Sequence, residues 1–248
     1  MPDQIAILPF AVLIGVVLGA LGSGGAILSL PILVYIAALP VRQAIGVSQF
    51  VVGCAALVGA LLQARQGNIR WHPAIAFAIA GLPATRLGAW IAQRLDPTLL
   101  MLCFAAIAAV AGIRLLMSSQ DASSGRIRLG VSLVSGAIVG LLTGLLGVGG
   151  GFLLVPALIA FGGLDARRAT ATSLPVIALN SLAGAVQQHG QWTAVLSLAL
   201  TFLGATLVGT FIGLRLGRKA SDLKLKQALG ALLIGVGCVV AVANLWKR

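Results

Sequence analysis

Two clusters of glycine residues are the features of this chain best suited to binding chemistry. They open the apolar runs GSGGAILSLPIL at 22–33 and GVGGGFLLVPAL at 147–158. Glycine is a poor helix former, so we expect the chain to turn at each cluster and a new helix to begin there. The first turn of a helix has free N–H groups and the positive end of the helix dipole, which favour a small anion. The clusters therefore predict an anion site with backbone ligands at Gly24, Gly25, Gly149, Gly150 and Gly151.

Polar side chains that follow each cluster add donors to this site. Ser48 and Gln49 lie early in the apolar segment after the first cluster, and Thr172 and Ser173 lie early in the segment after the second. Hydroxyl and amide groups can donate hydrogen bonds to the oxygens of an oxyanion. The same groups also cap helices or bond one helix to another, and the sequence leaves both roles open. We predict that these four side chains line the site.

Arg86 lies well inside the apolar segment at 72–95. No acidic residue lies within an apolar segment to pair with it, because the chain has no Glu and its five Asp fall in loops or at segment ends. An unpaired arginine inside a membrane is costly and often functional, and its planar fork suits an oxyanion. We predict a contact between Arg86 and the anion, with bonding to backbone carbonyls at the glycine turns as the alternative.

Composition places these residues in a membrane protein. The chain is 59% hydrophobic and 9% charged, with a mean hydropathy of +1.08. A soluble domain of 248 residues cannot bury that much apolar surface, so lipid must solvate much of it. Two of its apolar segments are too long for one crossing, because 33 helical residues reach about 50 Å against a hydrocarbon core of about 30 Å. The eight segments lie at about 5–39, 43–64, 72–95, 98–117, 129–161, 166–189, 192–216 and 223–246.

The chain also repeats itself, with one half at 1–117, a polar linker at 118–128 and a second half at 129–248. A duplicated membrane unit with interrupted helices in matching places is typical of secondary transporters. We predict an all-α polytopic membrane protein of two four-segment repeats, each opening with a glycine-broken hairpin or discontinuous helix. A constant offset of 125 aligns the two glycine clusters and carries Arg42 to Arg167, Ser48 to Ser173, Gly59 to Gly184 and Gln63 to Gln188.

Basic residues help to decide whether the two long segments cross or fold back. With Arg86 set aside, 16 Lys and Arg remain of 17. Fold-back hairpins place twelve of the 16 on the linker side, whereas single crossings place nine on one side and seven on the other. The positive-inside rule therefore favours hairpins, a cytoplasmic linker and both termini outside. Three crossings per half make the repeats inverted, and the two glycine turns are then expected to meet near the midplane. A broken, tilted single span with parallel repeats is the alternative.

The run GVGGGFLLVPAL, followed by ATATSL at 169–174, resembles the sulfite exporter TauE/SafE family of membrane permeases. The resemblance covers nearly the whole chain, including the weaker copy in the first half. It implies a multi-pass protein of the inner membrane that exports sulfite or a small organosulfonate. We expect a secondary transporter of a small oxyanion, with another small organic anion as the alternative.

Other classes fit the residues less well. The net charge of +12 is explained by Lys and Arg in loops, so no nucleic-acid partner is expected. A serine enzyme would need a base beside Ser23, and the two histidines, His72 and His189, lie at segment ends. The cysteines lack metal-ligand spacing and no P-loop is present, so we expect no catalytic residue, metal or cofactor. The expected partners are a small anion and the lipid bilayer; a homodimer or a role as a membrane partner subunit stays open.

Overall fold

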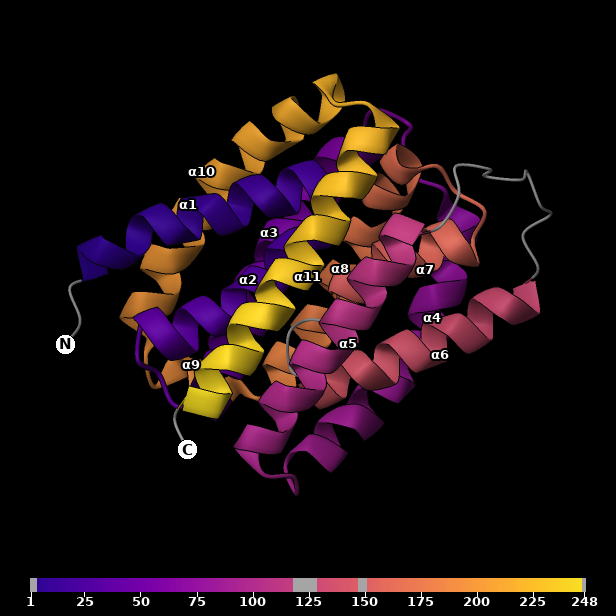
Figure 1. The fold of residues 1–248 in the computed structure, drawn as a ribbon. Coiled ribbons are helices and arrows are strands. Elements are labelled where there is room, and N and C mark those ends of the chain that lie inside the picture. The colour runs from indigo at the N-terminus through magenta and orange to yellow at the C-terminus, as the bar shows by residue number, and fades with distance from the viewer. Residues whose placement is uncertain (1–3, 118–128, 147–150, 247–248) are drawn as a thin grey trace.

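The computed structural model describes residues 4–117, 129–146 and 151–246, and this part of the chain is helical without strands. Gly149 and Gly150 lie outside the described residues. Figure 1 shows the helices packed as one bundle. Its elements are α1 (Gln4–Leu21), α2 (Gly24–Pro31), the π-helix η1 (Ile32–Ile36), α3 (Val41–Ala64), α4 (Trp71–Ala92), α5 (Pro97–Met117), α6 (Leu129–Leu146), α7 (Gly151–Ala160), α8 (Ala166–Gln187), α9 (His189–Thr193), α10 (Leu196–Lys219) and α11 (Asp222–Trp246).

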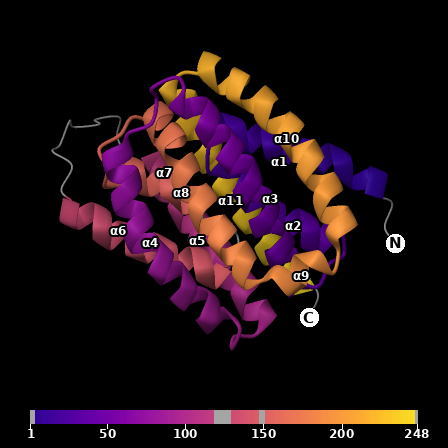
Figure 2. The same cartoon turned by 180° about the vertical axis from the view of Figure 1, so that it is seen from behind.

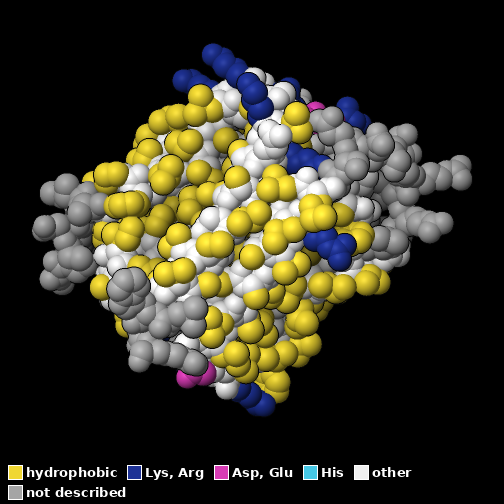
Figure 3. Space-filling model, viewed as in Figure 1, with side chains coloured by type: hydrophobic (Ala, Val, Ile, Leu, Met, Phe, Trp, Pro, Cys, Tyr) yellow, Lys and Arg dark blue, Asp and Glu magenta, His cyan; other side chains and the backbone are white. Residues whose placement is uncertain are grey.

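Six of these helices are long and apolar enough to cross a membrane. They are α3, α4 and α5 in the first half, and α8, α10 and α11 in the second. Large apolar side chains such as Ile79, Val186 and Val239 are more than 60% exposed on the outside, as expected for a surface that lipid solvates. Hydrophobic side chains cover the flank of the molecule in Figure 3. The prediction of an all-α polytopic membrane protein is confirmed.

The chain folds back on itself at the first glycine cluster. Gly22 has a φ of +69°, which a residue without a Cβ adopts easily, and the Ser23 N–H donates to the carbonyl of Leu21 at 2.8 Å. A Cβ on Gly25 would lie 2.5 Å from the carbonyl oxygen of Ile14, eleven residues earlier. In a continuous helix those residues would be about 16 Å apart, so α2 must return along α1.

The most extensive helix interfaces each join one half of the chain to the other. They are α1 with α10, α4 with α6, α5 with α11, and α3 with α8. The repeat makes α1 equivalent to α6 and α4 equivalent to α10, so the first two interfaces are equivalent to each other. Each of the last two interfaces joins a helix to its own equivalent in the other half. Gly53 packs against Leu182 whereas Gly59 packs against Leu174, so α3 and α8 run antiparallel (Figure 2). Equivalent helices that run antiparallel are what inverted halves require; the inversion itself stays a prediction.

Two of these interfaces depend on glycine for their close approach. A Cβ on Gly144 of α6 would lie 1.9 Å from the carbonyl oxygen of Thr85 of α4, and one on Gly213 of α10 would lie 2.1 Å from that of Val16 of α1. Small residues four apart permit such contacts between membrane helices. These glycines, unlike Gly22, therefore serve helix packing.

The basic residues gather at one end of the bundle, which Figure 3 shows at the top of its view. Successive crossing helices alternate in direction, so α3, α5 and α10 finish at the end where α4, α8 and α11 begin. We call this the basic end and the other the opposite end. Among the described residues, the opposite end has Arg42 and Arg94. The basic end has ten: Arg65, Arg70, Arg114, Arg167, Arg168, Arg215, Arg218, Lys219, Lys224 and Lys226.

Candidate functional site

The paired helices α3 and α8 carry a set of buried polar side chains. Each of these side chains is 5% exposed or less. Polar groups enclosed by membrane helices are costly unless something bonds them, so each needs a partner or a function. The members are Ser48, Gln49, Thr170, Thr172, Ser173, Asn180 and Ser181.

The predicted polar ligands lie at two different levels of this helix pair. A Cβ on Gly184 would meet the Gln49 amide at 2.5 Å, which sets Ser48 and Gln49 beside the last turn of α8. Thr172 lies twelve residues before Gly184, which is about 18 Å along a helix. Thr172 and Ser173 are therefore well separated from Ser48 and Gln49. This arrangement does not bring the four side chains together, because antiparallel helices carry early residues to opposite ends; their role as ligands stays a prediction.

Gln49 is the most informative member of the level nearer the opposite end. Its Oε1 accepts a hydrogen bond of 3.3 Å from Nε2 of Gln188, while its own Nε2 is buried without a partner in the described structure. Ser48 bonds instead to Ser29 of α2. The Oδ1 of Asn180, one turn before Gly184, is also buried without a partner. A buried amide with a free N–H₂ group is able to donate to an anion.

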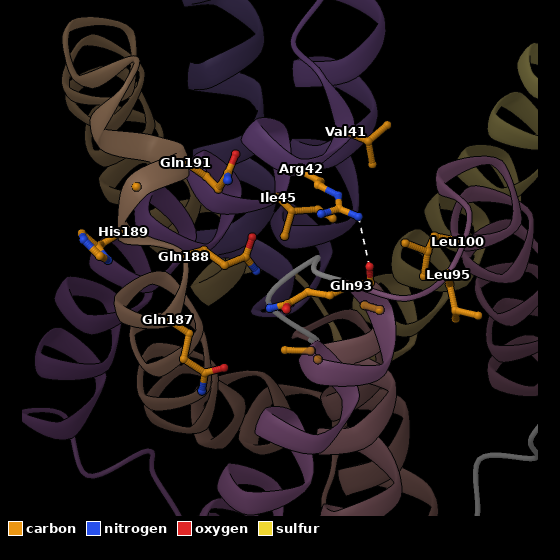
Figure 4. Close-up of a pocket in the computed structure, with 14 residues that line it drawn as sticks. Val41, Arg42, Ile45, Gln93, Leu95, Leu100, Gln187, Gln188, His189 and Gln191 are labelled. Carbon is orange, nitrogen blue, oxygen red and sulfur yellow. Dashed lines mark hydrogen bonds between the residues drawn. The ribbon is translucent and has the colours of Figure 1, made fainter.

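A cavity of about 320 Å³ lies beside this level and is shown in Figure 4; we call it the opposite-end vestibule. Nη2 of Arg42 donates to the carbonyl of Gln93 at 3.0 Å, which holds the guanidinium at the wall. Gln188 points into the cavity and also bonds Gln49, so it links the cavity to the buried amide (Figure 4). No acidic residue is among the described lining. The polar lining is Arg42, Gln93, Gln187, Gln188, His189 and Gln191.

The hydroxyls at the level nearer the basic end form hydrogen bonds within the protein itself. Thr172 Oγ1 accepts a hydrogen bond of 3.1 Å from the Arg70 N–H, and Ser173 Oγ donates to the carbonyl of Thr170 at 2.8 Å. The turn at Gly22 packs against Thr170 and Ser173. The first glycine turn thus lies toward the basic end rather than at the midplane. These hydroxyls serve as the cap and helix bonds that the sequence had left open.

The remaining predicted ligands have different surroundings. Gly24 and Gly25 begin α2 and pack against Val17, Leu18 and Leu21 of α1. Gly151 begins α7.

Arg86 is exposed on α4 and does not line this vestibule. It also does not line a second cavity, described below, at the basic end of the bundle. The stripe of Gly81, Thr85 and Gly88 faces α6 and α8, and this turns Arg86 outward. The contact of Arg86 with the anion stays a prediction, and this arrangement does not bring Arg86 to either cavity.

Arg42 and Gln188 line the vestibule and Asn180 is buried on α8, but the sequence does not predict any of the three as a ligand. The sequence places Gln188 near a segment end and uses Arg42 only in the comparison of charges. The repeat match of Gln188 with Gln63 was the one sequence signal that distinguished it. Its inward position arises because α9 packs on α3, with Trp192 stacked on Phe50 at 4.2 Å between ring centres.

Comparison with known proteins concerns the class of the whole chain rather than its site residues. A family model described as Sulfite exporter TauE/SafE matches residues 7–240. A "Probable membrane transporter protein" from Xylella fastidiosa is 30% identical over 246 residues, covering 95% of this chain and 92% of that protein. Another from Methanocaldococcus jannaschii is 28% identical and covers 93% of this chain and 94% of its own. No solved structure matches the chain at a significant level.

Proposed function

Because this chain belongs to the sulfite exporter TauE/SafE family and is a multi-pass membrane transporter, we propose that it carries a small oxyanion across the inner membrane. The proposed substrate is sulfite or an organosulfonate, and the proposed direction is export. One observation carries the choice of an anion. The free Nε2 of Gln49 lies behind a vestibule whose polar lining includes Arg42 and several amides, with no acid among its described residues.

The proposed path through this vestibule has three steps. The exposed guanidinium of Arg42 attracts the anion, since its bond to the Gln93 carbonyl uses only one of its five N–H donors. The amide of Gln188 then receives the anion at the inner wall, and the buried amide of Gln49 binds it after water is lost. Cations are disfavoured throughout because the guanidinium offers donors alone and carries positive charge.

Passage of the anion to the basic end requires the two halves of the chain to exchange conformations. Inverted repeats provide for this, because each half can adopt the shape of the other. No Asp or Glu lies inside an apolar segment, so a proton relay of buried carboxylates is not available. If transport is coupled to protons, the substrate carries them. Sulfite, a weak acid that titrates near neutral pH, suits this role, whereas a sulfonate is too strong an acid.

The alternatives differ in how well the side chains support them. Another small organic anion would use the same donors and is the main competitor. A serine enzyme is disfavoured because Ser23 is fully buried while His72 and His189 are exposed at helix ends. A role as a passive partner subunit gives no reason for an unpartnered buried amide behind a vestibule.

Flux into proteoliposomes is the test of the proposed function. The panel comprises sulfite, a sulfonate such as isethionate, sulfate, and small carboxylates such as acetate. We expect protein-dependent movement of sulfite or the sulfonate with a KM below that of any carboxylate. Transport of carboxylates alone would assign the competing substrate class. No protein-dependent flux of any anion, with folded protein in the vesicles, would refute the proposal.

A further inference from the structure

A second cavity, of about 250 Å³, lies at the basic end of the bundle. It is enclosed by α1, α3, α8, α10 and α11 together with the loop before α4, and we call it the basic-end vestibule. All of the residues that line it are described. Its polar lining is Gln63, Gln66, Asn68, Arg167, Thr170 and Arg218.

The lining of this cavity matches that of the opposite-end vestibule through the internal repeat. Several of its residues lie 125 positions before or after a residue that lines the other cavity. The matched pairs are Gly19 with Gly144, Gln63 with Gln188, Arg167 with Arg42, and Leu225 with Leu100. The two halves of the chain therefore build one cavity at each end from equivalent residues.

The match extends to a specific hydrogen bond at each mouth. Nη2 of Arg167 donates to the carbonyl of Ala220 at 2.8 Å, and Ala220 directly follows the end of α10. Nη2 of Arg42 makes the same bond to Gln93, which directly follows the end of α4. In both cases one guanidinium is anchored at a helix end and keeps further N–H donors for a ligand.

The basic-end vestibule has the stronger positive charge of the two. Arg167 and Arg218 both line it, whereas Arg42 is the single guanidinium among the described lining of its counterpart. The nearby carboxylate of Asp222 accepts a bond of 3.2 Å from the backbone N–H of Arg167, so it is directed at the start of α8. Two arginines that line one small cavity suit a doubly charged or tridentate oxyanion.

The polar route from cavity to core is present on one side only. The side chain of Gln188 connects the opposite-end vestibule to Gln49 through a hydrogen bond. The residue equivalent to Gln49 in the second half is Leu174, which is fully buried and apolar. Gln63, the equivalent of Gln188, accepts a bond of 3.0 Å from Asn68 instead. At the position where the opposite-end vestibule leads to the Gln49 amide, the basic-end vestibule therefore has the apolar side chain of Leu174.

We propose that the basic-end vestibule is a second anion-binding site, where a small oxyanion is loaded for export, with Arg167 and Arg218 as its cationic ligands. This inference rests on the proposed function. The positive-inside rule orients the basic end toward the cytoplasm, which is the side from which an exporter takes its substrate. The anion is then loaded at the basic-end vestibule and released at the opposite-end vestibule, and the two sites are built from equivalent residues of the two halves.

The test measures transport from each side separately. Proteoliposomes of two opposite, verified orientations receive sulfite at the basic end or at the opposite end, for wild type, Arg167→Gln and Arg218→Gln. We expect each substitution to raise the KM roughly tenfold or more from the basic end and less than twofold from the opposite end. Arg42→Gln should show the reverse preference. Arg168→Gln is the matched control, because Arg168 is adjacent to Arg167 but pairs with Asp165 and does not line the cavity.

The outcomes separate this proposal from the proposed function. Equal KM values for Arg167→Gln, Arg218→Gln and Arg168→Gln, while wild type transports sulfite, would overturn the loading site alone. A KM raised equally from both ends would place the arginines at a shared central site and would also overturn it. Since Arg167 also anchors α10, Arg167→Lys and the elution volume of each purified variant check the fold.

Equilibrium binding of sulfite to the purified protein decides the inference if wild type shows no flux. Two sites in wild type, of which one is lost in the Arg167→Gln, Arg218→Gln double variant, would support it. The same number of sites in both proteins, or none in wild type, would refute it.

Discussion

Replacing Gln49 by leucine separates stability from function at the opposite-end site. Gln49 packs against Gly184, and at the equivalent place in the other half Leu174 packs against Gly59 with 3.3 Å to a Cβ built there. The fold therefore already accepts leucine at this position of the repeat. Gln49→Leu removes a buried N–H₂ group that has no partner among the described residues, which relieves about 1–3 kcal/mol. It also loses the bond from Gln188, a loss of about 0.5–1.5 kcal/mol, and the half-buried Gln188 can turn to water.

The net expectation is a change in the free energy of unfolding between about −0.5 and +2.5 kcal/mol, so the variant should be about as stable as wild type or more stable while it binds its anion poorly. A hydrogen bond to a charged ligand contributes about 1.5–3 kcal/mol, so affinity should fall roughly 10- to 100-fold. The measurements are the thermal unfolding midpoint of purified protein and the sulfite KM in proteoliposomes. Gln43→Leu, a half-buried position on the same helix outside the vestibule lining, is the control. A clear drop in the midpoint would show that the Gln49 amide is structural. An unchanged KM in a folded variant would remove Gln49 from the site.

Three further predictions follow from the packing and the charges. Gly144→Ala should lower the unfolding midpoint by roughly 2–12 °C, because its Cβ would lie 1.9 Å from the Thr85 carbonyl oxygen and overpacking costs about 1–3 kcal/mol. Gly204→Ala is the control and should leave the midpoint unchanged, because a Cβ there has nothing within 4 Å. Equal midpoints for the two variants would contradict the close packing of α4 on α6. In a variant without native cysteines, an impermeant thiol reagent on intact cells should label Arg248→Cys and spare Ser123→Cys, and the reverse result would refute the predicted orientation. Arg86→Gln should leave sulfite affinity within about twofold of wild type because the side chain is exposed on α4, whereas a tenfold loss in folded protein would return Arg86 to the site.

Much of the fold was available from the sequence because its physical signals are local. Apolar runs separated by charged loops predicted the crossing helices, and the glycine cluster at 22–25 predicted the turn that Gly22 makes with its positive φ. The offset of 125 between the halves also pointed to Gln63 and Gln188, which prove to be equivalent wall residues of two cavities. Each of these features depends on neighbours in the chain or on a comparison of the chain with itself.

The composition of the site was decided by the tertiary structure. Whether Arg86 faces lipid or protein depends on which stripe of α4 packs against α6, and the apolar sequence around it does not specify that stripe. Whether Thr172 and Gln49 lie together depends on the direction and register of α8 against α3, which separates them by about 18 Å along the helix. The free amide of Gln49 is likewise a property of its surroundings, because a hydrogen-bond donor is unpartnered only with respect to groups brought near it by distant parts of the chain. The sequence by itself thus determined the membrane class, the turn at the first glycine cluster and the 125-residue offset, while helix register and rotation determined which polar residues form the candidate path.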